Sequence, residues 1–186
     1  MHHIQTTKSW IEKFVIKHNL CPFAAFPFRK EKIRYCLEIT TSEEQLLTTL
    51  HRELLLLHRT TTDEVETAFI IHPHVLNDFL DYNDFVHTAN ELLQEMNLEG
   101  EIQIASFHPN YQFAGEPKDD PSNFVARSPF PMLHLLREDS VATAIQNHAN
   151  TAQIPLENID KMNELGLDHL NLLLGNLSQE NSKFKK

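Results

Sequence analysis

Three segments in the first 110 residues carry the hydrophobic patterns of strands. Residues 33–40 alternate between apolar and mostly polar side chains, which is the period of a strand with one polar face. Residues 67–71 end in a continuous apolar run, as expected of a strand that is buried on both faces. Residues 101–107 follow Gly100 and give the third expected strand.

Apolar residues at intervals of three and four predict helices before and between these strands. The expected helices are one capped by Thr6 or Thr7 and ended at Leu20–Cys21–Pro22, one capped by Ser42 with Gln45 and running to about His58, and one from about Val75 to Asn97. The aromatic, proline-broken run from Phe23 to Arg29 is expected to be an extended connector.

This order of elements predicts an α/β (or α+β) fold with a small three-stranded, parallel βαβαβ sheet, an N-terminal helix and a helical C-terminal region. Strands two and three end at His72 and His108, each followed by proline. Because both ends then lie at one edge of the sheet, this edge is the expected place for a ligand. We expect one domain over residues 1–175 and a polar, disordered tail over residues 176–186.

A loop of about 15–20 residues follows His108, which is long for a connection within a domain and indicates a functional segment. A helix is expected to begin at Pro129 or Pro131. Further helices are expected from a cap at Asp139 or Ser140, from Pro155 to Gly166, and from there to about Gly175.

Composition excludes several classes of function. The net charge of −10 argues against general binding of nucleic acids or anionic membranes. The four glycines are far apart, so neither a phosphate-binding loop nor a dinucleotide turn can be built, and the cofactor remains unknown. No apolar stretch reaches the ~20 residues of a membrane helix. Two cysteines are too few for a disulfide scaffold, so we expect a cytoplasmic protein.

The residues with chemical potential are concentrated between His108 and Glu138. Arg127 precedes the expected helix, and a helix start beside an arginine attracts a carboxylate or phosphate. His134, Arg137 and Glu138 would share one face of that helix. The candidate catalytic residues are His108, Cys21 and His134, and the candidate substrate-binding residues are Tyr111, Asp120, Asn123, Arg127, Ser128, Arg137 and Glu138.

Three residues with reactive side chains, Cys21, His72 and Cys36, have structural interpretations as well. Cys21 follows a helix C-terminus, whose dipole raises a thiol pKa, so packing is at least as good an explanation as nucleophilic attack. His72 and Cys36 are favoured as structural residues. A metal held by His108 and His134 with Asp120 or Cys21 is a further alternative, although no local ligand spacing supports it.

Several segments resemble a bacterial family known as domain of unknown function 1415. They are Trp10 with Leu20–Ala24, Asn77–Phe79 with Tyr82–Phe85, Ile102–Pro109, Tyr111–Ala114, Asp119–Asp120 with Asn123, and Arg127–Pro129 with Leu133–Glu138. The resemblance implies that most of the candidate residues belong to the family pattern, but it implies no reaction. Ala126 stands where the family usually has Asn, and Phe130 where it often has Tyr. His72 is not part of the pattern.

These observations predict an enzyme, or at least a binding protein, for a small anionic metabolite held by Arg127 and Arg137. His108 would act as its acid or base, and the reaction class stays open. The alternatives are the metal-dependent enzyme and a non-catalytic module that binds a partner protein. The oligomeric state is not predicted.

Overall fold

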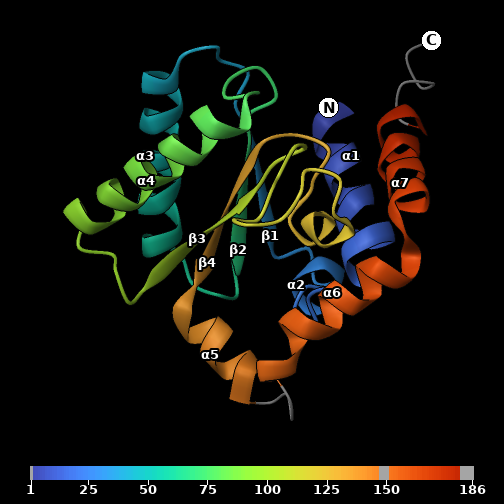
Figure 1. The fold of residues 1–186 in the computed structure, drawn as a ribbon. Coiled ribbons are helices and arrows are strands. Elements are labelled where there is room, and N and C mark those ends of the chain that lie inside the picture. The colour runs from blue at the N-terminus through green and yellow to red at the C-terminus, as the bar shows by residue number, and fades with distance from the viewer. Residues whose placement is uncertain (1, 147–150, 181–186) are drawn as a thin grey trace.

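A central sheet with helices on both faces organises the computed structural model, which describes residues 2–146 and 151–180 (Figure 1). The strands are β1 (Ile33–Leu37), β2 (Thr67–Ile71), β3 (Ile102–Phe107) and β4 (Met132–Arg137). The helices are α1 (His2–Trp10), the π-helix η1 (Ile11–Ile16), α2 (Ala25–Arg29), α3 (Glu43–Arg59), α4 (Phe79–Glu95), the 3-10 helices η2 (Pro121–Val125) and η3 (Thr151–Gln153), α5 (Glu138–Gln146), α6 (Ile154–Leu165) and α7 (Leu167–Glu180).

The sheet has four strands in the order β1-β2-β4-β3, so the predicted three-stranded parallel sheet is wrong in detail. β1 and β2 pair in parallel, whereas β4 runs antiparallel to both β2 and β3. The mixed α/β class and the three predicted strands are confirmed. The difference lies in β4, an additional antiparallel strand that lies between β2 and β3.

The predicted helix at Pro129 or Pro131 does not form, because residues 132–137 are strand β4. Leu133 and Leu135 face the core on one side of the sheet, while Met132 faces the core on the other side. An apolar run that is buried on both faces has no clear strand period, so it resembles a helix segment in sequence. Pairing with β2 and β3 decides in favour of the strand.

Two hydrophobic cores lie on opposite faces of the sheet. α3 and α4 cover one face, with Leu50, Leu54 and Tyr82 fully buried against the strands. α1, η1, α6 and α7 cover the other face, with Trp10 and Phe14 at its centre. Figure 1 shows α3 and α4 on one side of the strands and α1, α6 and α7 on the other.

Helix starts and ends follow local capping chemistry. The Ser42 hydroxyl accepts a hydrogen bond from the Gln45 backbone N–H (3.3 Å), which confirms the predicted start of α3. α4 begins four residues later than expected, because the Asp78 carboxylate accepts hydrogen bonds from the Leu80 and Asp81 amides. Gly166, with φ +74°, ends α6 as predicted.

Other boundaries differ from the prediction. Thr6 and Thr7 do not cap a helix; they lie buried inside α1, which already includes His2. The expected connector over 23–29 contains the short helix α2. α5 begins at Glu138, directly after β4, rather than after a cap at Asp139 or Ser140. α7 continues past Gly175 to Glu180, so the first part of the predicted tail is helical, and residues 181–186 lie outside the described residues. None of the helices in the described ranges is both long and apolar enough to span a bilayer.

Candidate functional site

The ends of β2 and β3 lie at one edge of the sheet, as predicted, and carry His72 and His108. Ile71 and Phe107 both pair with Met132 of β4, so the two histidines follow at the same level on either side of that strand. Both histidines are fully buried on the side of α4, where their rings contact Tyr82 at centroid distances of 5.8 and 5.0 Å.

His108 uses both ring nitrogens in backbone hydrogen bonds. The Asn110 amide donates to Nδ1 (3.0 Å), so the ring proton is on Nε2, which donates to the Leu76 carbonyl (3.2 Å). A ring that accepts at Nδ1 is neutral, and burial lowers the pKa of His108 in the same sense. Neither nitrogen is left for a substrate, so the ring acts as a fixed link between two loops.

His72 has one satisfied nitrogen. Its Nδ1 donates to the Val75 carbonyl (3.1 Å), while Nε2 is buried and has no hydrogen-bond partner among the described residues. Burial lowers the pKa of His72 to about 4. The neighbouring Tyr82 links α4 to β4 and β3 at this edge. Its hydroxyl donates to the Met132 carbonyl (2.7 Å) and accepts from the Phe107 amide (3.0 Å).

The loop after His108 is held from inside by two predicted binding residues. Asn123 is fully buried, its Oδ1 accepts from the Phe113 amide (2.9 Å), and its Nδ2 donates to the Pro117 carbonyl (2.8 Å). Arg127 donates from Nε to the Tyr111 carbonyl (3.1 Å) and from Nη2 to the Lys118 carbonyl (2.6 Å). Both side chains therefore supply internal hydrogen bonds that shape the loop.

Three further loop residues have local partners. The Asp120 carboxylate caps η2 by accepting from the Ser122 amide (2.8 Å), and the nearby Ser122 side chain together with this amide lowers the pKa of Asp120. The Ser128 hydroxyl donates to the Phe130 carbonyl (2.7 Å) and is buried. The ring of Tyr111 packs against Phe79 at 5.1 Å. No helix starts beside Arg127, since β4 follows, so the expected anion site at a helix N-terminus is not formed there.

His134, Arg137 and Glu138 do not share a face. His134 and Arg137 are three residues apart on a strand, so they point to opposite sides of the sheet. On the side of α3, the Arg137 guanidinium donates to the carbonyls of Leu57 (2.7 Å) and Thr60 (2.7 Å). Glu138 opens α5, and its amide donates to the Glu101 carbonyl (2.9 Å).

His134 lies on the sheet face opposite His108 and has one nitrogen unused. The Thr67 hydroxyl donates its only proton to the Leu135 carbonyl (2.6 Å), so it must accept from His134 Nε2 (2.7 Å). The Nδ1 lone pair has no hydrogen-bond partner among the described residues, and His134 is only half-buried. The ring stacks on Phe69 with centroids 3.9 Å apart and planes at 7°. Burial lowers the pKa of His134 to about 3.

Aromatic rings surround His134 on this face. Phe107 lies 6.2 Å from its ring centroid, and Tyr35 stacks on the far part of Phe69 at 6.2 Å. The neighbouring positions Ala105 and Leu136 are also half-buried, so the face is not fully covered by helices. We call His134, Thr67, Phe69, Phe107 and Tyr35 the His134 cluster.

The candidate cysteine belongs to a different part of the molecule. Cys21 lies in the turn between η1 and α2, beside Leu20, whose carbonyl accepts a hydrogen bond from Asn158 of α6 (2.8 Å). Burial raises the pKa of the Cys21 thiol, despite hydrogen bonds from the Phe23 and Ala24 amides. For Cys36, burial and the nearby Glu53 raise the pKa to about 11.

The predicted residues therefore do not converge on one pocket. His108 and His134 lie on opposite faces, and no hydrogen bond or ring contact between described residues joins Cys21 to either. Within the described ranges, no group of three or more His, Cys, Asp and Glu side chains is placed to hold a metal ion. Sequence reasoning missed Thr67 and Phe69, which orient His134. Their only signal was the two-residue period of a strand, which places Thr67 and Phe69 on one face of the sheet.

The fold and the site together define an α/β protein with a mixed sheet, closed over two buried histidines on one face and half-open over an aromatic histidine cluster on the other. The chain belongs to the family described as "Protein of unknown function (DUF1415)", whose model matches residues 2–172. No curated protein and no solved structure matches the chain.

The two departures from the family pattern lie near the buried edge. Ala126 is buried, and its carbonyl accepts the hydrogen bond of the His108 amide (3.3 Å). The ring of Phe130 packs edge-on against His3 with centroids 4.8 Å apart. At both positions the residue of this chain serves packing or backbone pairing.

Proposed function

We propose that this chain binds a small neutral molecule on the His134 cluster, with His134 Nδ1 accepting a hydrogen bond from an O–H or N–H of the ligand. The observation that carries the proposal is the fixed state of the ring. Thr67 holds the proton on Nε2 and Phe69 holds the plane of the ring, so the Nδ1 lone pair is oriented before any ligand arrives.

The surroundings of His134 favour a ligand with an aromatic or apolar body. The partly exposed rings of Phe107 and Tyr35 provide contact surface with little conformational entropy to lose, while the buried Phe69 lies beneath His134 and supports it. A polar group on such a ligand would find one directional partner in Nδ1, which is the usual composition of a small-molecule site.

An anionic ligand fits this cluster poorly. The pKa of about 3 keeps His134 neutral at physiological pH, and a lone pair repels an anion. Arg127 and Arg137, which were expected to hold the anion, donate to backbone carbonyls instead. The anionic metabolite of the sequence-based prediction is therefore replaced in this proposal by a neutral hydrogen-bond donor.

Binding is better supported than catalysis. A general base works best when its pKa is near the operating pH, and that of His134 lies far below it. A nucleophilic cysteine needs a lowered pKa, whereas burial raises that of Cys21. The proposal therefore assigns no reaction to the cluster.

Nitrogen NMR of the histidine rings tests the proposal directly. We expect phenol, indole or 2-pyridone to shift the His134 Nδ1 resonance in a saturable way, because each donates an O–H or N–H from a planar ring. The variant His134→Phe keeps an aromatic ring over Phe69 but lacks both nitrogens, and it should bind these probes at least about tenfold more weakly, the effect of ~1.4 kcal/mol.

The exposed His74→Phe variant is the matched control and should bind the probes like the original chain. Inorganic phosphate and acetate, titrated in the same way, test the anionic alternative. Phosphate-induced shifts at Arg127 together with an unchanged His134 resonance in all neutral titrations would refute the proposal.

A further inference from the structure

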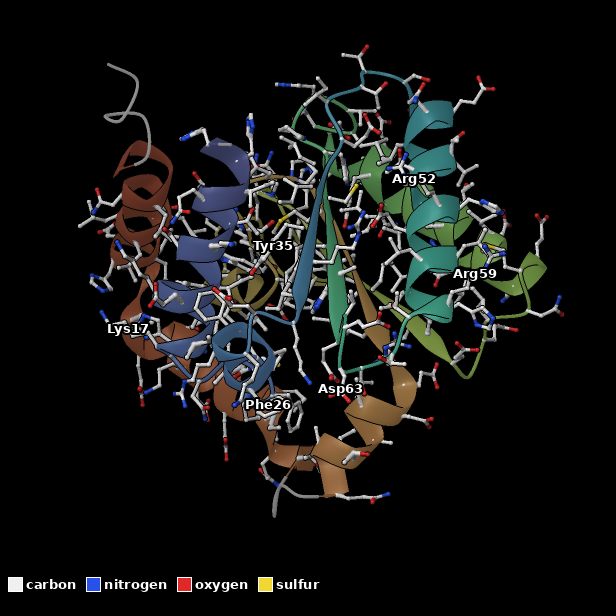
Figure 2. All side chains as sticks on the ribbon, turned by 180° about the vertical axis from the view of Figure 1, so that it is seen from behind. Lys17, Phe26, Tyr35, Arg52, Arg59 and Asp63 are labelled. Carbon is white, nitrogen blue, oxygen red and sulfur yellow. The ribbon has the colours of Figure 1, made fainter. Side chains whose placement is uncertain are left out.

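The outward side of α3 carries a regular stripe of residues, independent of the His134 cluster. Six buried side chains of this helix face the sheet and α4. The opposite side consists of Glu44, Thr48, His51, Arg52, Leu55 and Arg59, which we call the α3 stripe. At 100° per residue these positions fall on one side of the helix. Figure 2 shows Arg52 and Arg59 on the outer side of α3, with no other helix in front of them.

The α3 stripe changes charge along its length. Its first turn is acidic, with Glu43 and Glu44, and its last turn is basic, with His58 and Arg59. Glu44 and Arg59 form no salt bridge with other described residues. The chain as a whole has a net charge of −10, whereas this end of the α3 stripe is basic.

Two hollows accompany these two ends. One, of about 360 Å³, lies between α3 and α4 and is lined by Glu43, Glu44, Asp81 and Asp84 together with apolar side chains. The other, of about 300 Å³, is lined by His51, Arg52, Leu55, Leu56 and Arg59. One hollow is acidic and the other is basic with an apolar centre, so each is complementary to the other in charge.

The spacing of the stripe has a twofold relation. Its midpoint lies between His51 and Arg52, and Thr48 and Leu55 lie equally far from it, as do Glu44 and Arg59. A second copy of α3, packed antiparallel on the first, would place each Glu44 opposite Arg59 of the other copy and each Thr48 opposite Leu55. A self-complementary patch of this kind is the requirement for a twofold-symmetric dimer.

We propose that this chain self-associates through the α3 stripe, with the two copies of α3 antiparallel about a twofold axis near His51 and Arg52. The basic end of each copy then faces the acidic hollow of the other. Arg52 keeps its contacts with Glu53 (3.5 Å) and Cys36 (3.7 Å) and lines the centre of the contact. The contact lies on the sheet face opposite the His134 cluster, so this inference does not depend on the proposed function.

The association is weak and sensitive to salt. One pair of 17-residue helices, each about 25 Å long, buries less than a stable interface requires. Its charged ends remain near solvent, where salt screens them within about 8–10 Å. Dimers therefore form with rising protein concentration at low ionic strength and dissociate in concentrated salt.

Sedimentation of the full chain over a concentration series tests this inference. We expect the sedimentation coefficient to rise with protein concentration at low salt. In about 0.5 M sodium chloride, which screens these charge pairs, it should stay at the monomer value. Glu44→Arg or Arg59→Glu should each weaken association at least about tenfold, since each places like charges opposite one another. The double charge swap in one chain restores the opposite charges and should restore association.

Glu91→Arg and Arg29→Glu are the controls, because they change exposed residues elsewhere by the same net charge and should leave association unchanged. A second measurement uses Thr48→Cys with Leu55→Cys. These positions are about 10.5 Å apart along one helix, too far for a disulfide within the chain, so oxidation should give a covalent dimer. A chain that stays monomeric at every concentration in low salt, or a double swap that fails to restore association, would overturn the inference.

Discussion

Histidines on the two faces of the sheet differ in burial and in hydrogen bonding. On the side of α4, His108 is fully buried and both ring nitrogens are bonded to backbone groups. On the other side, His134 is half-buried and only Nε2 has a partner. Burial lowers the pKa of both rings. Accessibility and unused hydrogen-bonding capacity, rather than residue type or protonation state, therefore separate a structural histidine from a candidate binding residue.

The largest expected effect on stability comes from replacing each of these two histidines. We expect His108→Ala to lower the free energy of unfolding by about 3–4 kcal/mol, because it leaves a cavity and two unpaired backbone groups. His134→Phe keeps the stacking on Phe69 and should lower it by no more than about 1 kcal/mol. Urea unfolding of both variants measures the difference, and a larger loss for His134→Phe would invalidate the comparison.

The second largest expected effect is acid destabilisation through His72, on the α4 side of the sheet. The pKa of His72 is about 4 in the folded chain against 6.5 in the unfolded chain, so only the unfolded state takes up this proton as the pH falls from about 6.5 to 4. His72 therefore contributes its full stability above pH 6.5 and loses about 3 kcal/mol of it by pH 4, at about 1.4 kcal/mol per pH unit.

The measurement is urea unfolding across this pH range with the variant His72→Gln, which should flatten the pH dependence. Replacement of the exposed His74 by Gln is the control. An equal slope in the His72→Gln variant and the original chain would show that another group is responsible.

The loop after His108 should respond to its internal hydrogen bonds. Asn123→Ala removes the acceptor of the Phe113 amide and the donor to Pro117, and we expect a loss of about 2 kcal/mol. Hydrogen exchange at the Phe113 amide should accelerate, while that of β2 should change only by the global loss of stability. An unchanged rate at Phe113 would mean that Asn123 does not hold the loop.

The smallest expected change is at Thr67. The variant Thr67→Val removes the acceptor of His134 Nε2–H and the donor to the Leu135 carbonyl, at about 1 kcal/mol of stability. Without this acceptor, the preference for the proton on Nε2 should be lost, and nitrogen NMR should report a mixture of the two neutral ring forms. A ring that keeps its proton on Nε2 in this variant would show that Thr67 does not set the proton position.

Several candidate residues of the sequence analysis make internal hydrogen bonds in the structure. Asn123, Arg127 and Arg137 are polar residues in a segment rich in such groups, and their hydrogen bonds go to backbone carbonyls. A sequence gives the number of donors but not the number of carbonyls that a folded loop leaves unpaired. Most side-chain hydrogen bonds go to backbone groups or water, and these three side chains follow that rule.

Local chemistry determined much of the fold from the sequence alone. The cap at Ser42, the glycine at the end of α6, and the apolar periods of β1, β2 and β3 all act between residues close in the chain. The placement of His72 and His108 at one edge follows from these strands, since their relative direction is set by the helices that connect them.

Tertiary structure decided the rest, above all the state of residues 132–137. An apolar run of this length suits either a buried helix or a central strand, and only the hydrogen bonds offered by β2 and β3 select the strand. That choice turned His134 and Arg137 to opposite faces and brought His134 onto Phe69 and Thr67. The partners of His134 lie more than sixty residues away in sequence, so no local pattern could specify them.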